Sequence, residues 1–252
     1  MVVTSRIVLS GLLCLGLLTA TIPAHAQDRT VRLTSLDWPP YTGSELPDGG
    51  ASVVVARAAF EAMGYELEVS FYPWNRAVNL ARDGERYHGY FPEYYASSIE
   101  ADFHFSDAMG SGPLGLAEQA DNPFEWESIE DLHGLRIGVV SGYVNTDAFD
   151  AAVAAGDIQG LEAPADSNNL RMLQAGRLQM AVIDQNVMNY LLATEMPDAA
   201  ESLRFNSRLL EDKSLHICFS RTERGKELAE IFNQGLEKID IEALMQSYFD
   251  QL

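Results

Sequence analysis

Leu173-Gln-Ala-Gly-Arg-Leu-Gln-Met-Ala-Val-Ile-Asp184 contains the end of a helix, a turn and a strand. Gly176 fits the position after a helix C-terminus, where a left-handed backbone conformation is common. Residues 178–183 are apolar except at Gln179, which is typical of a strand covered on both faces of a parallel sheet. The stretch therefore predicts a parallel α/β fold. Asp184 then stands at the carboxyl end of a strand, where ligands bind in folds of this class.

The same alternation of strands and helices extends in both directions along the chain. Residues 66–71 alternate strictly between apolar and polar side chains, which predicts a strand. Residues 51–63 are almost all apolar and are followed by Gly64, which predicts a helix with a glycine C-terminus. The other expected elements are strands over 31–36, 88–91, 135–140 and 215–219, helices over 74–82 and from Ser167 to Gly176, and two C-terminal helices, the second capped by Asp240.

One interruption of this pattern predicts a division into two lobes. Residues 110–115 are rich in glycine and are expected to form a loop, and residues 118–130 are polar and acidic. Leu135 then restarts the strand–helix alternation. The two stretches of alternating elements are therefore expected to build separate α/β units.

The first 26 residues have the features of a secretory signal peptide. Arg6 precedes an uncharged apolar run over residues 7–22, and Ala24-His-Ala26 supplies the small-x-small pattern of a cleavage site. A membrane anchor is the alternative, but the run is shorter than the ~20 residues that span a bilayer. We expect export to the periplasm with cleavage before Gln27. Only Cys218 would then remain, so we expect no disulfide within the mature chain.

The composition excludes some partners and gives little support to catalysis. Hydrophobic residues make up 47% of the 252 residues, enough for a core, whereas 17 Lys and Arg against 37 Asp and Glu argue against nucleic-acid binding. Neither a P-loop nor a G-x-S-x-G stretch is present. The histidines have no metal-ligand spacing, so no catalytic residue, metal or cofactor is expected.

The order of several motifs resembles the type II periplasmic solute-binding proteins, in particular the family 3 group that contains polar amino-acid binders of ABC importers. The motifs that carry the resemblance are Trp38-Pro-Pro-Tyr-Thr-Gly43, Gly49-Gly50, Phe105-Ser-Asp107, Ile129-Glu-Asp-Leu-His-Gly-Leu-Arg-Ile-Gly-Val139 and Leu173–Asp184. The resemblance implies a two-lobed α/β fold in which each lobe is a mostly parallel sheet flanked by helices, and two crossing segments join the lobes. Lobe 1 would contain residues 27–117 plus 211–252, and lobe 2 residues 118–210.

The resemblance also implies positions for the ligand. Trp38 falls where the family has an aromatic ring that stacks on the ligand, although it could instead pack on Pro39 and Pro40. Asp184 falls where amino-acid binders have a carboxylate for the ligand's ammonium group, although it could instead cap a helix. Ser141-Gly142-Tyr143 falls at a turn whose backbone N–H groups meet a ligand carboxylate.

One departure from the family makes an ordinary α-amino acid in the usual pose unexpected. Amino-acid binders have an arginine that grips the α-carboxylate, and the matching position here is Ile99, or Glu100 if one residue is gapped. Arg76 is a candidate substitute for this clamp, or else a solvated helix residue. The absence of the arginine leaves the nature of the solute open.

Four further aromatic and acidic residues complete the expected binding site. Trp74 is a cleft wall or a lobe-packing aromatic, and Tyr41 shares the turn of Trp38. Glu93 and its neighbour Tyr94 follow a short strand, so their loop is expected to face the cleft unless Glu93 is only an exposed acid. A glutamate beside Asp184 would favour a cationic group on the ligand, because paired carboxylates raise each other's pKa unless a cation lies between them.

Three functions fit these expectations. The first is a monomeric, non-enzymatic receptor that binds a small polar solute and delivers it to the membrane permease of an ABC importer. The second is a sensory module of similar fold that reports the solute to a membrane receptor. The third is an enzyme on this fold, such as a periplasmic dehydratase resembling cyclohexadienyl dehydratase, which would need a general acid–base and carboxylate clamps in the cleft.

Overall fold

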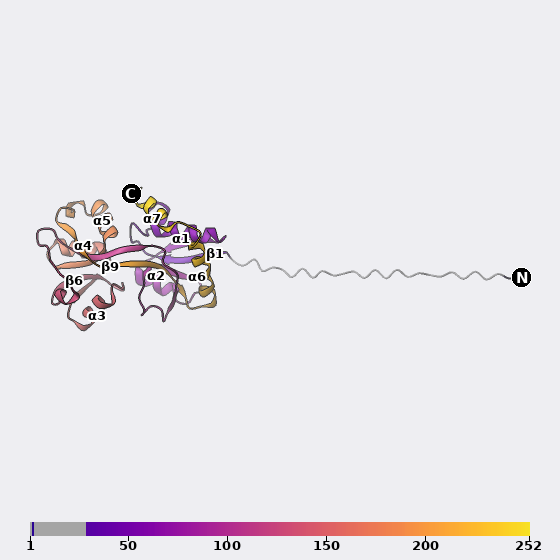
Figure 1. Cartoon of the computed structure of the whole chain (residues 1–252), viewed down its shortest axis with the longest axis horizontal. Helices are drawn as coiled ribbons and strands as arrows, with labels where there is room; N and C mark the ends of the chain where they lie inside the picture. The colour runs from indigo at the N-terminus through magenta and orange to yellow at the C-terminus, as the bar shows by residue number, and fades with distance from the viewer. Residues whose placement is uncertain (1, 3–28) are drawn as a thin grey trace.

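The computed structural model describes residue 2 and residues 29–252 (Figure 1). The expected signal peptide and its cleavage site before Gln27 lie outside the described residues, apart from Val2. Within residues 29–252, no helix combines the length and the apolar character that crossing a membrane requires.

The described residues form a mixed α/β structure whose strands follow the order β2-β1-β3-β9-β5-β8-β6-β7, with β4 also paired to β9. The strands are β1 (Thr30–Ser35), β2 (Glu66–Phe71), β3 (Gly89–Tyr94), β4 (Phe103–Phe105), β5 (Ser111–Gln119), β6 (Arg136–Val140), β7 (Gln159–Ala163), β8 (Met180–Asp184) and β9 (Leu203–Ser220). The helices are α1 (Ala51–Ala62), α2 (Trp74–Ala81), α3 (Asp147–Ala155), α4 (Asp166–Gln174), α5 (Gln185–Thr194), α6 (Glu223–Leu236) and α7 (Ile241–Phe249), with 3-10 turns at Pro47–Gly49, Ile129–Leu132 and Pro197–Ala199.

The strands divide into a first group around β1 and a second group around β6, each with a parallel centre. β1 pairs in parallel with β2 and β3, and β6 pairs in parallel with β7 and β8. Antiparallel pairs arise where β5 and β9 join, because both run between the groups: Leu203–Ser214 of β9 pair with β5, and Leu215–Ser220 pair with β3 and β4. The two-lobed fold expected from the resemblance is therefore present.

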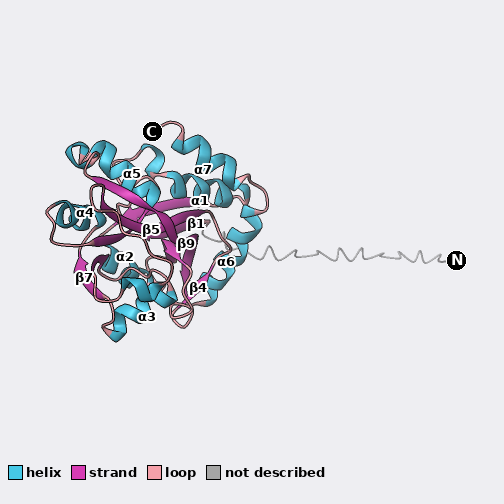
Figure 2. Cartoon of the chain, turned by 60° about the vertical axis from the view of Figure 1, so that its left-hand side comes forward, coloured by secondary structure: helices cyan, strands magenta, loops and turns pink. Residues whose placement is uncertain are grey.

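Helices cover the outer faces of both groups of strands (Figure 2). α3, α4 and α5 lie with the second group, and α1, α2 and α6 lie with the first (Figure 1). The C-terminal helices α6 and α7 both contact α1, and the Phe60 and Phe232 rings lie 5.0 Å apart at the α1–α6 contact. The chain therefore ends against its first helix, and the exact lobe boundaries, 27–117 plus 211–252 and 118–210, remain a prediction.

Several local predictions agree with the structure. α1 ends at Ala62 with Gly64 at a φ of 76°, as its C-terminal glycine predicted. Asp240 caps α7, since its carboxylate accepts a hydrogen bond from the Ala243 backbone N–H at 3.0 Å. Cys218 is fully buried in β9, in agreement with a packing role.

Two segments differ from prediction. Residues 110–115 were expected to be a loop, but all except Gly110 belong to β5. The glycines of β5 reflect close packing, because a Cβ at Gly112 would stand 2.1 Å from the Asp184 carboxylate and one at Gly115 would stand 2.5 Å from Phe205. Residues 215–219 were expected to form a short strand, but they are the end of the 18-residue strand β9.

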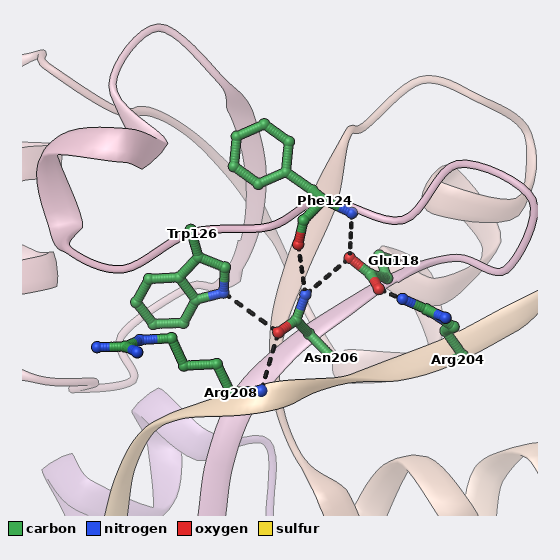
Figure 3. Close-up of polar contacts among 6 residues, drawn as sticks. All are labelled: Glu118, Phe124, Trp126, Arg204, Asn206 and Arg208. Carbon is green, nitrogen blue, oxygen red and sulfur yellow. Dashed lines mark hydrogen bonds and ion pairs between the residues drawn. The ribbon is translucent and has the colours of Figure 1, made fainter.

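A buried polar network attaches the segment after β5 to β9 (Figure 3). The Glu118 side chain is 1% exposed and accepts hydrogen bonds from the Phe124 backbone N–H (3.0 Å) and the Asn206 amide (2.9 Å). Its other oxygen pairs with the Arg204 Nε at 2.7 Å. Asn206 also accepts a hydrogen bond from the Trp126 indole at 3.3 Å. The network satisfies the buried charge and orders residues 118–126 beside the second group of strands.

Candidate functional site

Two cavities meet between the two groups of strands and share part of their walls. The outer cavity has a volume of about 570 Å³ and is formed by residues from both groups. The inner cavity is smaller, about 20 Å³, and borders β3 and β9. The residues that line both cavities are Leu36, Trp38, Trp74 and Tyr143. An outer volume of this size suits a small solute.

Trp38 is part of this shared wall. It is 7% exposed and stacks on Tyr41, with ring centroids 4.7 Å apart, while the Tyr94 ring meets it edge-on at 5.8 Å. The local turn is closed by hydrogen bonds between Trp38 and Thr42, including Trp38 N–H to the Thr42 carbonyl at 2.7 Å. Packing against two tyrosines fixes the indole in place and leaves it available to both cavities.

Trp74 and Tyr143 form the opposite part of the wall and connect the two groups of strands. Trp74 begins α2 and donates its indole N–H to the Gly142 carbonyl at 2.9 Å. The Tyr143 ring lies edge-on to it at 5.6 Å. Gly142 has a φ of 84°, and a Cβ there would stand 2.2 Å from the Asn75 amide oxygen. A glycine at position 142 therefore lets the two groups approach closely.

The turn at residues 141–143 differs from a helix N-terminus. The N–H of Ser141 donates to the Ala163 carbonyl at 2.9 Å, and the N–H of Tyr143 donates to the Val140 carbonyl at 3.1 Å. α3 begins only at Asp147, capped by Thr146. Two of the backbone donors expected to meet a ligand carboxylate are thus engaged within the protein, and Tyr143 contributes its ring to the cavity wall.

Asp184 acts both as a helix cap and as a contact between the two groups of strands. Its carboxylate accepts hydrogen bonds from the backbone N–H groups of Asn186 (2.8 Å) and Val187 (3.2 Å) at the start of α5. It also accepts from the Tyr41 hydroxyl at 3.2 Å to each oxygen and from the Tyr94 hydroxyl at 3.2 Å. Burial raises the pKa of Asp184 to about 7, although these hydrogen bonds act in the opposite direction.

Glu93 lines the inner cavity from β3. It is 5% exposed, so it is not an exposed loop acid. Its carboxylate accepts hydrogen bonds from the Tyr90 hydroxyl (2.9 Å) and the Tyr94 backbone N–H (3.0 Å). Burial raises the pKa of Glu93 to about 8, and these donors only partly oppose the effect. β3 continues through Pro92 with a register shift, which is why Glu93 lies in the strand rather than after it.

Asp166 is a buried carboxylate of the site that the sequence analysis missed. It begins α4, lines the outer cavity and is 6% exposed. Burial and the nearby Asp184 raise its pKa to about 7, opposed by a hydrogen bond from the Trp38 side chain. Ser167 was expected to cap this helix, but the N-cap is Ala165, two residues earlier. No sequence signal distinguishes Asp166 among the 37 acidic residues of the chain.

Arg76, the candidate carboxylate clamp, lies outside both cavities, as do Ile99 and Glu100, the positions that match the family's arginine. Arg76 is exposed, and its guanidinium lies over the Tyr72 ring, 4.9 Å from the centroid. The Tyr95 hydroxyl donates to the Glu100 carboxylate at 3.1 Å, and Ile99 packs against the core. The structure thus brings Trp38, Trp74, Glu93, Tyr94 and Tyr143 to the cavities. Tyr41 and Asp184 lie directly behind them.

Among the described residues, no group of three or more His, Cys, Asp or Glu side chains is arranged to hold a metal ion.

Comparison with known proteins identifies the fold. No protein-family model matches the sequence, and no curated protein matches it. Solved structures do match. A histidine kinase sensor domain with similarity to periplasmic binding proteins superposes with a TM-score of 0.74 at 18% identity, covering 88% of this chain and 95% of the other. The GluR0 ligand-binding core from Nostoc punctiforme, in complex with L-glutamate, superposes with a TM-score of 0.70 at 18% identity, covering 88% and 98%.

A transport protein gives a similar match. The amino-acid ABC transporter substrate-binding protein AbpA from Streptococcus pneumoniae, bound to L-arginine, has a TM-score of 0.70 at 17% identity, covering 88% of this chain and 95% of that one. The chain therefore has the two-lobed periplasmic-binding-protein fold, and the resemblance to type II solute-binding proteins is confirmed at the level of the fold.

Proposed function

We propose that the protein is an exported, monomeric receptor that binds a small polar solute between its two lobes and delivers it to the membrane permease of an ABC importer. The observation that carries the proposal is the pair of connected cavities whose walls come from both groups of strands, with Trp38 and Trp74 facing Tyr143. The periplasm is the proposed location, in keeping with the signal peptide expected over residues 1–26.

Closure of the lobes would couple solute binding to delivery. The hydrogen bonds from Tyr41 and Tyr94 to Asp184, and from Trp74 to Gly142, all join the first group of strands to the second. A solute favours closure only to the extent that it binds the closed form more tightly than the open form. Walls contributed by both groups provide that difference, because the complete set of aromatic contacts exists only in the closed form.

A sensory role is the second candidate, and one observation favours it. The structures of similar fold include a histidine kinase sensor domain as well as transport proteins. The site would be the same in both roles, and only the membrane partner would differ. Import of radiolabelled solute by cells that lack this protein distinguishes the two: loss of import supports the receptor, whereas unchanged import with loss of a solute-dependent transcriptional response supports the sensor.

An enzymatic role receives less support from the site. Elimination of a carboxylated substrate needs basic side chains to hold the carboxylates. The residues that line the two cavities include no Lys, Arg or His. We therefore propose binding without chemistry.

Solute binding is tested by a thermal-shift screen of amino acids, polyamines, osmolytes and short organic acids on the purified protein, followed by calorimetry. At least one compound should raise the melting temperature in a concentration-dependent manner. Trp38→Ala should abolish the rise, whereas Glu61→Gln, an exposed change on α1, should leave it intact. A response that Trp38→Ala leaves unchanged would place the binding site elsewhere. No response to any compound would contradict solute binding.

A further inference from the structure

The two cavities contain acidic and aromatic side chains without basic ones. Glu93 lines the inner cavity, and Asp37, Glu45, Asp166 and Glu195 line the outer cavity. Arg208 and Lys213 line a separate cavity of about 430 Å³ that shares no residue with these two. The walls of the cleft therefore supply acidic groups and no cation, on a chain whose formal net charge is already −20.

We propose that the solute is a compact organic cation, a protonated amine or a quaternary ammonium compound, held among the rings of Trp38, Trp74 and Tyr143 and balanced by Glu93 and Asp166. This inference rests on the proposed solute-binding function and names the chemical class of its ligand. A carboxylate on the solute is not required.

The aromatic residues form a box suited to a cation. Trp38, Trp74 and Tyr143 line both cavities, so they surround the place where the cavities meet. The Trp38 and Tyr94 rings are nearly perpendicular, at 85°, and so are those of Trp74 and Tyr143, at 79°. Rings in these orientations present both faces and edges to one small volume. A cation is attracted to ring faces, most strongly to those of tryptophan, and the attraction grows when the site is desolvated.

Two buried carboxylates form no ion pair within residues 29–252. Glu93 and Asp166 are 5% and 6% exposed, and they border the aromatic box from the inner and the outer cavity. Lys213 is the weakest of the influences on the pKa of Glu93, and its ammonium donates to the Tyr95 carbonyl at 3.0 Å and pairs with Glu211 at 3.5 Å. Buried charges are normally paired, so a ligand cation would supply the missing partner.

The site lacks the contacts that an α-amino acid needs. Asp184 is occupied by Tyr41, Tyr94 and the first N–H groups of α5, which removes it as an ammonium ligand in this closed form. Arg76 does not line either cavity, so no guanidinium in these walls would bind a carboxylate. An ammonium group of the solute would therefore contact residues other than Asp184. No residue of the cavity walls would bind a carboxylate of the solute.

The test is calorimetric titration of the purified protein at pH 8.5 and constant ionic strength. The probes are choline, n-butylammonium, L-arginine, L-glutamate and 3,3-dimethylbutan-1-ol, a neutral carbon isostere of choline. Choline or butylammonium should bind at least about tenfold more tightly than the neutral isostere and L-glutamate. The stronger of the two identifies a quaternary or a primary ammonium group as the preferred head group.

Variants locate the charge that matters. Glu93→Gln and Asp166→Asn keep the side-chain shape and should each weaken binding of the preferred cation by about tenfold or more, since each removes one negative charge beside it. Glu61→Gln, which removes an exposed charge on α1, should leave the affinity unchanged.

The outcomes separate this inference from the proposed function. Equal binding of the neutral isostere, tighter binding of L-glutamate, or no binding of either cation would overturn the cation inference. If the wider screen then finds a different solute whose binding depends on Trp38, the proposed function stands. A thermal-shift screen without any response would overturn both.

Discussion

The Tyr41 hydroxyl lies 3.2 Å from both carboxylate oxygens of Asp184, and the two residues are 143 positions apart in the sequence. Asn186 donates to the same hydroxyl at 2.8 Å, and Gly112 leaves the space in which the carboxylate sits. These hydrogen bonds connect the turn after β1 to the end of β8. The contact between the two groups of strands therefore includes hydrogen bonds to a carboxylate that forms no ion pair within residues 29–252.

Tyr41→Phe should weaken the closed form. The variant removes one donor to Asp184 and the acceptor of the Asn186 amide, so the free energy of unfolding should fall by about 1–2 kcal/mol. The radius of gyration measured by X-ray scattering should also increase. Tyr95→Phe removes an exposed hydroxyl that bonds Glu100 and should leave the free energy of unfolding unchanged. Equal stability of the two variants would refute the role of the Tyr41 contact.

Gly112→Ala should disrupt the same contact from the opposite side. The added Cβ would stand 2.1 Å from Asp184 Oδ2 and 2.8 Å from the Tyr41 hydroxyl, so the carboxylate must move. We expect a loss of about 1–3 kcal/mol in stability, read by chemical denaturation, together with a weaker response to the solute. Ser111→Ala, at the exposed neighbouring position of β5, is the control. A Gly112→Ala protein that behaves like Ser111→Ala would show that this packing is unimportant.

Glu118→Gln should separate stability from binding. The change removes the charge that pairs with Arg204 but keeps the side-chain shape (Figure 3). Losing one partner of a buried network should lower the free energy of unfolding by about 1–3 kcal/mol. Each kcal/mol lowers the melting temperature by roughly 2–4 °C for a chain of this size. The dissociation constant for the solute should not change, because Glu118 lines neither cavity of the cleft. A large loss of affinity would show that the network supports the binding site.

The ligand-free protein should be less stable at pH 8 than at pH 5. Burial raises the pKa of Glu93 from 4.5 to about 8, and those of Asp166 and Asp184 from 3.8 to about 7. Between the ordinary and the raised values, the folded protein binds more protons than the unfolded chain. The free energy of unfolding therefore decreases as pH rises through this window and levels off above it.

The contribution of the cleft to this pH dependence is measurable by thermal melting. Wild type should lose several degrees between pH 5 and pH 8, since a decrease of one kcal/mol corresponds to roughly 2–4 °C. Glu93→Gln should show a smaller decrease, because it no longer titrates. Slopes that are identical in wild type and Glu93→Gln would mean that Glu93 does not retain its proton in the folded protein.

Cation binding should have the opposite pH dependence. A cation in the aromatic box favours the ionised forms of Glu93 and Asp166, so the affinity for choline or butylammonium should rise from pH 6 to pH 8.5. Calorimetry at the two pH values gives the ratio directly. An affinity that is constant across this range would argue that the two carboxylates are ionised already or do not face the solute.

Much of the fold was predictable because its elements have clear local signals. The alternation in residues 66–71 and the glycine after α1 gave β2 and α1 with nearly correct bounds. β5 was missed because Gly112, Pro113 and Gly115 have low strand propensity, and only contacts with Asp184 and Phe205 explain the two glycines. The length of β9 depends on pairing with β5, which no local pattern encodes.

The sequence indicated the aromatic part of the cavity walls better than the acidic part. Trp38, Trp74, Tyr94 and Tyr143 line the cavities, and their contact with a solute stays a prediction. Asp166 has no distinguishing sequence signal in a chain with 37 acidic residues, because its burial arises only from packing beside Trp38 and Asp184. The two proposed roles of Asp184 were alternatives in the sequence, and the structure shows the capping role.

The central claim is that a solute binds between the lobes against Trp38. The most direct measurement is the dissociation constant of the tightest compound from the screen, obtained by calorimetry for wild type, Trp38→Ala and Glu61→Gln. We predict a loss of at least about tenfold for Trp38→Ala and an unchanged value for Glu61→Gln. The same dissociation constant in all three proteins would contradict this account.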